Sequence, residues 1–441
     1  MAIAARFDLE LKQYDAVNAF VHAPLDSTVY MRMPPGYGER GKIYRLNKAV
    51  YGLRKAPLLW QRMFTSTLLE IGFTPIPHEP CCFACDGVLI FFYVDDIVVA
   101  YRKSNESLAR DLMSQLKRRY NLSGGEDLQW FLGIEVHRDR AKGLIWLNQA
   151  SYIDKIVKLA NTNQPDETPM AKIELFPYEE RASGQAIRNY QRKIGSLLYA
   201  AVTTRIDIAF AVSRLARFLT NPGPEHHAAA DRVFHYLYRH RGLGLQLGGA
   251  DDFLVATDAS FADNTLDRKS SQAYVMVLFG GVVGWRANKQ NTVTTSTTEA
   301  ELLSLSQGAK EGRFVKRLLG ELSVRLDDQR IRMQCDNRQS LRLVTEEIAR
   351  LQTKLRHVHI HNHWLRQECR DGRITVEHIS TKMIANGLTK ALSKSEFNDF
   401  IRQVNLVDIT DQITERRVKV QEILRDELDH NGIQMLMGDE G

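Results

Sequence analysis

The chain contains few cysteines and no long apolar run, and both absences narrow the classes of protein it can belong to. Five cysteines in 441 residues are too few for a disulfide framework, so a reducing compartment is expected. No stretch approaches the roughly 18 consecutive apolar residues that a membrane-spanning helix needs. The first residues also lack the apolar core and cleavage pattern of a secretory signal. These absences predict a soluble intracellular protein, in the cytoplasm or the nucleus, with no membrane partner.

Charge and length set weaker limits. The 59 Lys and Arg residues exceed the 53 Asp and Glu residues and give a net charge of +6. This mild basic excess is compatible with a polyanionic partner but is weak support for one by itself. A chain of 441 residues is too long for one ordinary core, so we expect about two to four domains.

An acidic pair interrupts the apolar segment at residues 91–100, which reads Phe-Phe-Tyr-Val-Asp-Asp-Ile-Val-Val-Ala. The flanking residues predict a buried hairpin, where the adjacent carboxylates of Asp95 and Asp96 repel each other and lose hydration. A divalent cation relieves that cost, because carboxylate oxygens are its natural ligands. The pair therefore indicates a metal site at a hairpin tip. The alternative is a surface β-turn between two core strands, since Asp is common in turns.

A third carboxylate, Asp15, lies in a strand pattern at residues 9–20 that leads into a turn. Two metal ions aligned on a phosphodiester need carboxylates from more than one strand, because each ion takes several oxygen ligands. Asp15 facing the acidic pair on a neighbouring hairpin would meet that need. The combination indicates phosphoryl-transfer chemistry.

Several motifs, in this order, resemble those of Ty1/copia-type retrotransposon reverse transcriptases. They are residues 13–20 (Gln-Tyr-Asp-Ala-Val-Asn-Ala-Phe), 29–34 (Val-Tyr-Met-Arg-Met-Pro), 46–53 (Leu-Asn-Lys-Ala-Val-Tyr-Gly-Leu), 93–96 (Tyr-Val-Asp-Asp), 131–135 (Phe-Leu-Gly-Ile-Glu) and 195–199 (Gly-Ser-Leu-Leu-Tyr). The resemblance covers about residues 8–392. It implies an RNA-directed DNA polymerase of mixed α+β and α/β class. The expected parts are a right-hand palm with partial fingers and a thumb, then a three-layer ribonuclease H-like domain.

Carried onto this chain, the resemblance implies that Asp15, Asp95 and Asp96 bind catalytic Mg²⁺, with Mn²⁺ as the other candidate ion. Phe20 resembles the bulky gate that excludes a ribose 2′-hydroxyl, although packing in the core explains it equally well. Gly52 and Tyr93 are implied to contact substrate, Gly52 because only a bare backbone fits beside the nascent base pair. The implied partners are an RNA template, a DNA primer, an RNA/DNA hybrid and deoxynucleoside triphosphates.

The downstream half resembles the copia-type ribonuclease H. That resemblance implies metal-binding and catalytic roles for Asp258 after a strand, Glu301 in a helix and Asp336 after another strand. Glu299 is expected to act as a capping acid in the first turn of the helix. The family pattern has Asp at the fourth position, where this chain has Asn386. An amide brings no negative charge to the metals, so impaired ribonuclease H activity is expected.

Two clusters of metal-binding residue types have plainer explanations. Histidines alternate at residues 357–363, but zinc sites usually draw ligands from separate elements or from i,i+4 positions on a helix. Three cysteines at residues 81–85 have no partner pair at zinc-ribbon spacing. A family-typical histidine segment and buried strand cysteines are therefore the preferred interpretations.

We expect four parts along the chain. They are residues 1–165 (palm, truncated fingers and start of the thumb), 166–250 (thumb and helical connection), 251–395 (ribonuclease H-like domain) and 396–441 (charged tail). Because Asp15 lies close to Met1, the upstream part of the fingers is expected to be missing. The alternative function is therefore a truncated, catalytically inactive remnant that still binds nucleic acid. The sequence does not indicate an oligomeric state.

Overall fold

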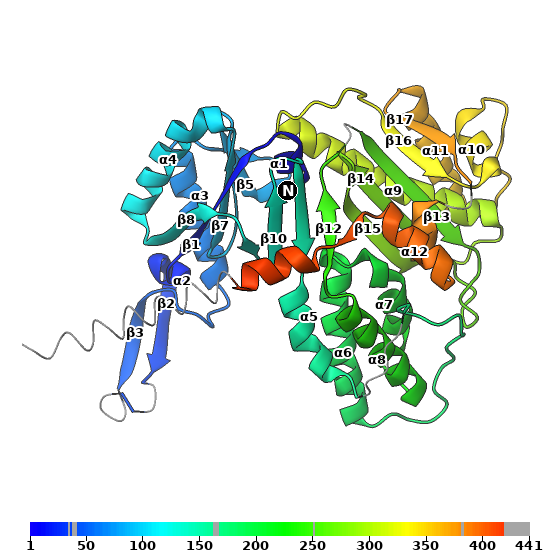
Figure 1. Cartoon of the computed structure of the whole chain (residues 1–441), viewed down its shortest axis with the longest axis horizontal. Coiled ribbons are helices and arrows are strands. Elements are labelled where there is room, and N and C mark those ends of the chain that lie inside the picture. The colour runs from blue at the N-terminus through cyan, green and yellow to red at the C-terminus, as the bar shows by residue number, and fades with distance from the viewer. Residues whose placement is uncertain (34–35, 38–41, 162–166, 250–251, 381–382, 419–441) are drawn as a thin grey trace, which may run out of the picture. The chain divides into compact units, whose positions relative to one another are not determined.

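The computed structural model divides the chain into two compact units (Figure 1). It describes residues 1–33, 36–37, 42–161, 167–249, 252–380 and 383–418. Unit 1 comprises residues 1, 3–132 and 314–325, and unit 2 comprises residue 2, residues 133–313 and the described residues from 326 onward. The first long segment of unit 1 therefore ends at residue 132, and unit 2 continues from residue 133. The predicted four-part division remains a prediction.

Unit 1 is built on a six-stranded sheet in the order β4-β5-β6-β7-β1-β8, with every neighbouring pair antiparallel. The strands are β1 (Glu10–Ala16), β4 (Thr74–Ile76), β5 (Glu79–Cys85), β6 (Val88–Tyr93), β7 (Asp96–Tyr101) and β8 (Leu122–Asp127). Helices α3 (Ala56–Glu70) and α4 (Glu106–Arg119) share one apolar core with β6 and β7. A separate ribbon pairs β2 (Pro24–Arg32) with β3 (Ile43–Lys48) after the short helix α2 (Ala19–His22).

In helix α3, Pro57 stands in the first turn, where a missing N–H costs nothing. Phe64 and Leu68 are buried on the apolar side of the helix. Leu58 and Leu69 are exposed. Each is one residue away from a buried leucine, and one helical step rotates a side chain by about 100°.

In unit 2, a five-stranded sheet has the order β15-β14-β13-β16-β17. The strands are β13 (Phe253–Ser260), β14 (Ser271–Leu278), β15 (Gly281–Lys289), β16 (Ile331–Cys335) and β17 (Ile374–His378). They are joined by α9 (Thr297–Glu321), of which residues 314–321 are assigned to unit 1, and by α10 (Arg338–Thr345) and α11 (Arg356–Arg370). The first three strands are antiparallel, whereas β16 is parallel to both β13 and β17. Helix α9 approaches this sheet closely at Gly308, where a Cβ atom would lie 2.5 Å from Thr257 Cγ2.

A second sheet of unit 2 places β18 (Leu406–Asp408), β12 (Leu243–Leu247), β11 (Leu144–Asn148) and β10 (Ile134–Asp139) side by side in that order. Around it lie α5 (Ala150–Ile156), α6 (Gly184–Thr203), α7 (Ala209–Leu215), α8 (Pro224–Arg239) and α12 (Lys394–Gln403). The predicted tail contributes to this core, since Phe397, Phe400 and Leu406 are buried in it. The antiparallel sheet of unit 1 and the partly parallel sheet of unit 2 confirm the predicted mixed α+β and α/β class.

Hydropathy adds one negative finding. Within the described ranges, no helix combines the length and the apolar character required to cross a bilayer.

Two candidate acidic sites

The β-sheet of unit 1 brings Asp15 and Asp96 together. In the antiparallel pairing of β1 with β7, Asp15 lies directly opposite Asp96, and such residues point to the same face of a sheet. Asp95 is adjacent, because its carbonyl oxygen accepts a hydrogen bond from Ala16 N at 2.9 Å. The three carboxylates predicted to act together therefore belong to one cluster.

The hairpin turn that carries the acids is strained. The turn residues are Val94 and Asp95, so Asp96 is the first residue of β7 rather than part of the tip, and it pairs with Tyr93. Val94 has a φ of 59°, which is unfavourable for a β-branched side chain. Trp60 Nε1 donates to the Val94 carbonyl at 2.6 Å and holds the turn in this conformation.

The electrostatics of the cluster favour a cation. Burial, followed by the charge of Asp95, raises the pKa of Asp15 above its ordinary value. Burial, followed by the charges of Asp95 and Asp15, raises the pKa of Asp96. Asp15 and Asp96 are therefore harder to ionise in this cluster, and a divalent ion would offset both their desolvation and the repulsion between the acids.

A cavity of about 270 Å³ adjoins Asp15 and Asp96 within unit 1. Its wall includes Ser123 and Gly124 of β8, together with Glu126. Glu126 is an acidic neighbour that sequence reasoning missed, because a register shift between β1 and β8 brings it there. The cavity leaves the two carboxylates accessible to a ligand.

Of the predicted substrate-contact residues, Phe20 is buried, whereas Gly52 and Tyr93 are exposed. Phe20 is buried in the core of unit 1, with its ring centroid 4.7 Å from that of Tyr51. Tyr51 was not predicted, but burial and the charges of Asp95 and Asp15 raise its pKa, which places its hydroxyl near the acids. Gly52 has a φ of +94° and would have no atom within 4 Å of a Cβ, so its backbone faces open space. Tyr93 is exposed.

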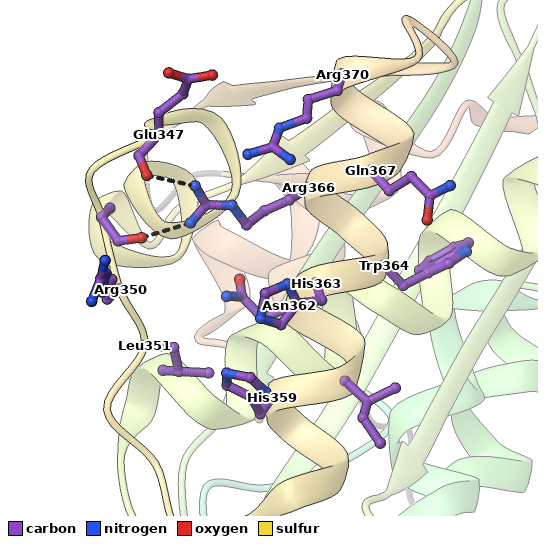
Figure 2. Close-up of a pocket in the computed structure, with 12 residues that line it drawn as sticks. Glu347, Arg350, Leu351, His359, Asn362, His363, Trp364, Arg366, Gln367 and Arg370 are labelled. Carbon is purple, nitrogen blue, oxygen red and sulfur yellow. Dashed lines mark hydrogen bonds between the residues drawn. The ribbon is translucent and has the colours of Figure 1, made fainter.

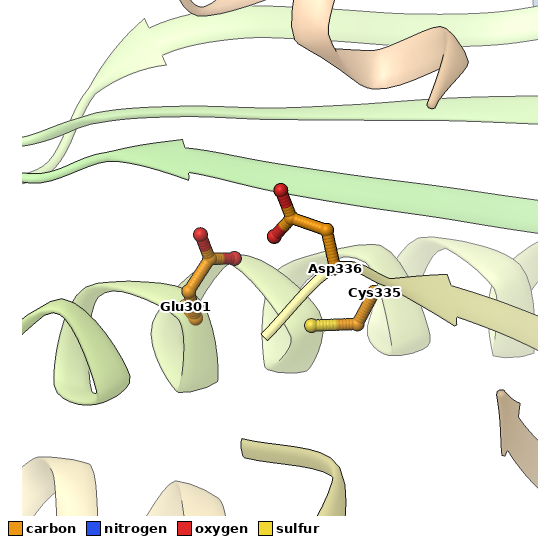
Figure 3. Close-up of side chains that lie close together, drawn as sticks. All are labelled: Glu301, Cys335 and Asp336. Atoms are coloured by element: carbon orange, nitrogen blue, oxygen red, sulfur yellow. The ribbon is translucent and has the colours of Figure 1, made fainter. Parts of the chain in front are cut away.

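The second acidic site lies near the C-terminal ends of β13 and β16, two adjacent parallel strands in the middle of the unit 2 sheet. Asp258 on β13 is 1% exposed, Glu301 near the start of α9 is 5% exposed, and Asp336 directly follows β16. Ala259 N donates to Glu301 Oε1 at 3.2 Å. Figure 3 shows the carboxylates of Glu301 and Asp336 together with the thiol of Cys335. In the part of the chain that the structure describes, these three residues form the one set whose ligand atoms all lie within 4.8 Å of one another.

The charge state of this site also fits a metal ion. Burial, followed by repulsion from Asp258 and Asp336, raises the pKa of Glu301 to about 9. Burial likewise raises the pKa of Asp258. Glu301 Oε2 is buried and has no hydrogen-bond partner. An ionised Glu301 would need a cation at this oxygen.

Comparison with known proteins assigns the chain to a family. A reverse transcriptase (RNA-dependent DNA polymerase) profile matches residues 1–172. The putative transposon Ty5-1 protein of Saccharomyces cerevisiae is 32% identical over 311 residues, which cover 67% of this chain and 99% of that protein. The chain belongs to the Ty1/copia-type retrotransposon Pol family.

Other members of the Pol family are longer than this chain. The Pol polyprotein from transposon TNT 1-94 of Nicotiana tabacum is 32% identical over 90% of this chain, but only 31% of that protein is covered. The chain thus spans about a third of that relative. A ribonuclease H1 structure from Halobacterium salinarum aligns with 34% of this chain at 13% identity and a TM-score of 0.23. That likeness is too weak to support a ribonuclease H-like assignment of unit 2. The strand order and the gathered acids are the stronger observations for that assignment.

The Pol-family position of the fourth nuclease acid is near the second site. Asn386 lies in the short 3₁₀ turn η5 (Ile384–Leu388) and is buried. Three residues later, the Thr389 hydroxyl donates to Asp258, which places this turn beside the carboxylate. Thr389 and Cys335 were missed by sequence reasoning, which considered only the three acidic residues and Asn386 at this site. Their contacts depend on the sheet bringing distant segments together.

Glu299 has the capping role that the sequence predicts. Its Oε2 accepts hydrogen bonds from Thr295 N at 2.6 Å and from the Thr295 hydroxyl at 2.8 Å, and its own N–H donates to Ser296 Oγ at 3.2 Å. Burial opposes ionisation of Glu299, but the hydrogen bonds that its carboxylate accepts from Thr353 and Thr295 outweigh this effect and lower its pKa. Glu299 therefore secures the start of α9, two residues before Glu301.

The cysteine cluster lies on a strand, whereas the histidine cluster lies on a helix. The cysteines at positions 81, 82 and 85 are half-buried on β5, and burial raises the pKa of Cys82 to about 11, as for a structural thiol. The histidine segment forms part of helix α11, so His359 and His363 stand at i,i+4 with ring centroids 4.5 Å apart. Alternating positions in the sequence thus become a helical pair.

Proposed function

We propose that unit 1 is the palm of an RNA-directed DNA polymerase, in which Asp15, Asp95 and Asp96 hold two divalent cations, Mg²⁺ or Mn²⁺. The observation that carries this proposal is the strand register that sets Asp15 opposite Asp96 beside Asp95. The raised pKa values of Asp15 and Asp96 support it, because they indicate a cluster that lacks a countercharge. The ligands expected by relationship are an RNA template, a DNA primer and deoxynucleoside triphosphates.

Within that proposal each side chain has a defined task. Bound cations would lower the pKa of the primer 3′-hydroxyl and neutralise the triphosphate. Asp15 and Asp96 supply oxygens from two strands, so that the ions are fixed by the sheet rather than by a loop. The Phe20 ring, held against Tyr51, limits the space beside the sugar, and Gly52 leaves its backbone free to approach the base pair.

Primer extension on an RNA template with Mg²⁺ tests the polymerase proposal. Wild-type protein should incorporate deoxynucleotides, and Asp95→Asn should abolish incorporation while leaving template–primer affinity intact. A catalytically inactive remnant would instead bind the template–primer without incorporation by either protein. Equal incorporation by wild type and Asp95→Asn would refute the assignment of the acids.

For unit 2 we propose a ribonuclease H-like site with reduced activity on an RNA/DNA hybrid. Glu301 is close enough to Asp258 and Asp336 for their charges to raise its pKa, and its unpartnered Oε2 provides a ligand atom for a cation. Asn386 supplies an amide where the family has a fourth carboxylate, so one negative charge is missing from the set. Hybrid cleavage by wild type and Asp258→Asn distinguishes weak activity from none.

A further inference from the structure

A large cavity in unit 2 lies outside both acidic sites. It has a volume of about 780 Å³ and is formed between the segment from Glu347 to Leu351 and helix α11 (Figure 2). This is the size of an ordinary ligand site. Its wall includes the histidine pair of α11, to which the proposed function gives no role.

Basic side chains follow one face of α11 along this cavity. His359, His363, Arg366 and Arg370 all line it, at spacings of i, i+4, i+7 and i+11. Residues at these intervals share a face of a helix. The row extends along the helix for about 16 Å, at 1.5 Å per residue. Arg350, from the opposite wall, adds a further guanidinium.

Arg366 shapes the cavity rather than remaining available to a ligand. Its guanidinium donates to the carbonyl oxygens of Ala349 at 2.6 Å and of Glu346 and Glu347 at 2.9 Å each. These bonds fix the loop against α11 (Figure 2). The loop is also tied to the start of α9, where the Thr353 hydroxyl donates to Glu299. The cavity is thus built by specific hydrogen bonds.

A polar group on the cavity wall lacks a partner. Asn362 lines the cavity and is only 3% exposed, yet its Oδ1 has no hydrogen-bond partner. The unpartnered amide oxygen offers a ligand a hydrogen-bond acceptor. A buried polar group without a partner is costly, so a ligand that satisfies it would bind more favourably.

The charges lining the cavity favour an anion over a metal ion. Arg350, Arg366 and Arg370 contribute three positive charges, against one negative charge from Glu347. A dication bound by His359 and His363 would face that net positive charge. No third His, Cys, Asp or Glu joins the pair in a metal-binding group among the residues that the structure describes.

We propose that this cavity binds backbone phosphates of a nucleic-acid strand. Arg350 and Arg370 contact phosphate oxygens, His359 and His363 donate along the same row, and Asn362 bonds a polar group of the nucleotide. The length of the row supports a strand over a free phosphate, because about 16 Å of helix spans several successive phosphates of one strand, which are spaced by about 3.4 Å along the axis of a duplex. The inference rests on the proposed function in one respect, namely that the chain engages nucleic acid.

Fluorescence anisotropy with a labelled RNA/DNA hybrid, in EDTA and over a series of KCl concentrations, tests the proposal. The double variant Arg350→Gln/Arg370→Gln should weaken binding and reduce the slope of log affinity against log salt by about one per arginine. The matched control is Arg356→Gln, which removes the same charge from α11 but does not line the cavity. Arg356→Gln should reduce the salt slope less than Arg350→Gln or Arg370→Gln alone. Thermal melting confirms that all proteins are folded.

Each outcome decides the proposal. An unchanged slope in the double variant, or no binding of the hybrid by wild type, would overturn it. Binding of inorganic phosphate or a nucleoside monophosphate, lost in the double variant while hybrid affinity is unaffected, would show a free-phosphate site and overturn the strand assignment. Stoichiometric Zn²⁺ binding that His359→Gln abolishes, with unchanged hybrid binding, would show a metal site instead. A reduced slope without primer extension by wild type would contradict the polymerase proposal alone.

Discussion

Without a bound cation, Glu301 should make the protein less stable as the pH rises. Its ordinary pKa is 4.5 and its pKa in the fold is about 9, because burial and the neighbouring Asp258 and Asp336 oppose ionisation. Between these values the folded protein keeps a proton that the unfolded chain has released. The free energy of unfolding therefore falls by about 1.4 kcal/mol per pH unit. The stabilising contribution is complete below pH 4.5 and is lost as the pH approaches 9.

The perturbation that isolates this effect is Glu301→Gln. Glutamine keeps an oxygen that can accept the hydrogen bond from Ala259 N, but it does not ionise. From pH 5 to pH 7 in EDTA, wild type should lose about 3 kcal/mol of stability more than the variant, from two pH units at the slope above. Added Mg²⁺ at pH 7 should stabilise wild type more than the variant, since ion binding to the folded state is linked to folding.

The assay is hydrogen exchange followed by mass spectrometry, with protection factors for the peptides that cover β13 and the start of α9. This measures the opening of the segments around Glu301 rather than of the whole chain, which contains two units and need not unfold in one step. Equal loss of protection in wild type and Glu301→Gln between pH 5 and pH 7 would refute the reasoning.

Three further predictions follow from single contacts. Asn386→Asp should raise cleavage of RNA in a hybrid, measured by gel; no gain would show that the site is damaged elsewhere. Lys193→Met leaves the buried Asp231 without its partner at 2.5 Å and should cost about 3–5 kcal/mol in thermal unfolding, whereas Lys193→Met/Asp231→Leu should recover most of it. Gly52→Ala should cost about 1 kcal/mol in stability because φ is +94°, with a larger loss of primer extension; unchanged extension would contradict its substrate-contact role.

The local parts of the structure were predictable from sequence, and the long-range contacts were not. The apolar residues on both sides of the Asp95–Asp96 pair indicated a hairpin, and β6 and β7 form it. The pairing of Asp15 with Asp96 was expected from the chemistry of two-metal sites and from resemblance. Tyr51 was missed because its nearness to the acids depends on the fold around α3, which no periodicity reveals.

The same distinction applies to unit 2. The helical pattern at residues 297–305 placed Glu299 in a first turn and so indicated a capping role, whereas the role of Glu301 was implied by the family resemblance. Thr389 could not, since its bond to Asp258 joins residues 131 positions apart. The alternating histidines suggested no shared face in the sequence, yet the helical repeat of α11 aligns His359 with His363. Periodicity must first be assigned correctly before side chains can be grouped.

A crystal of the protein with template–primer, a deoxynucleoside triphosphate and Mn²⁺ gives the most direct test of the central claim, that Asp15, Asp95 and Asp96 hold paired cations. An anomalous difference map should show two peaks bridging these carboxylates and the triphosphate. Nucleotide bound without anomalous density at the three acids, or with density only at other residues, would contradict the account.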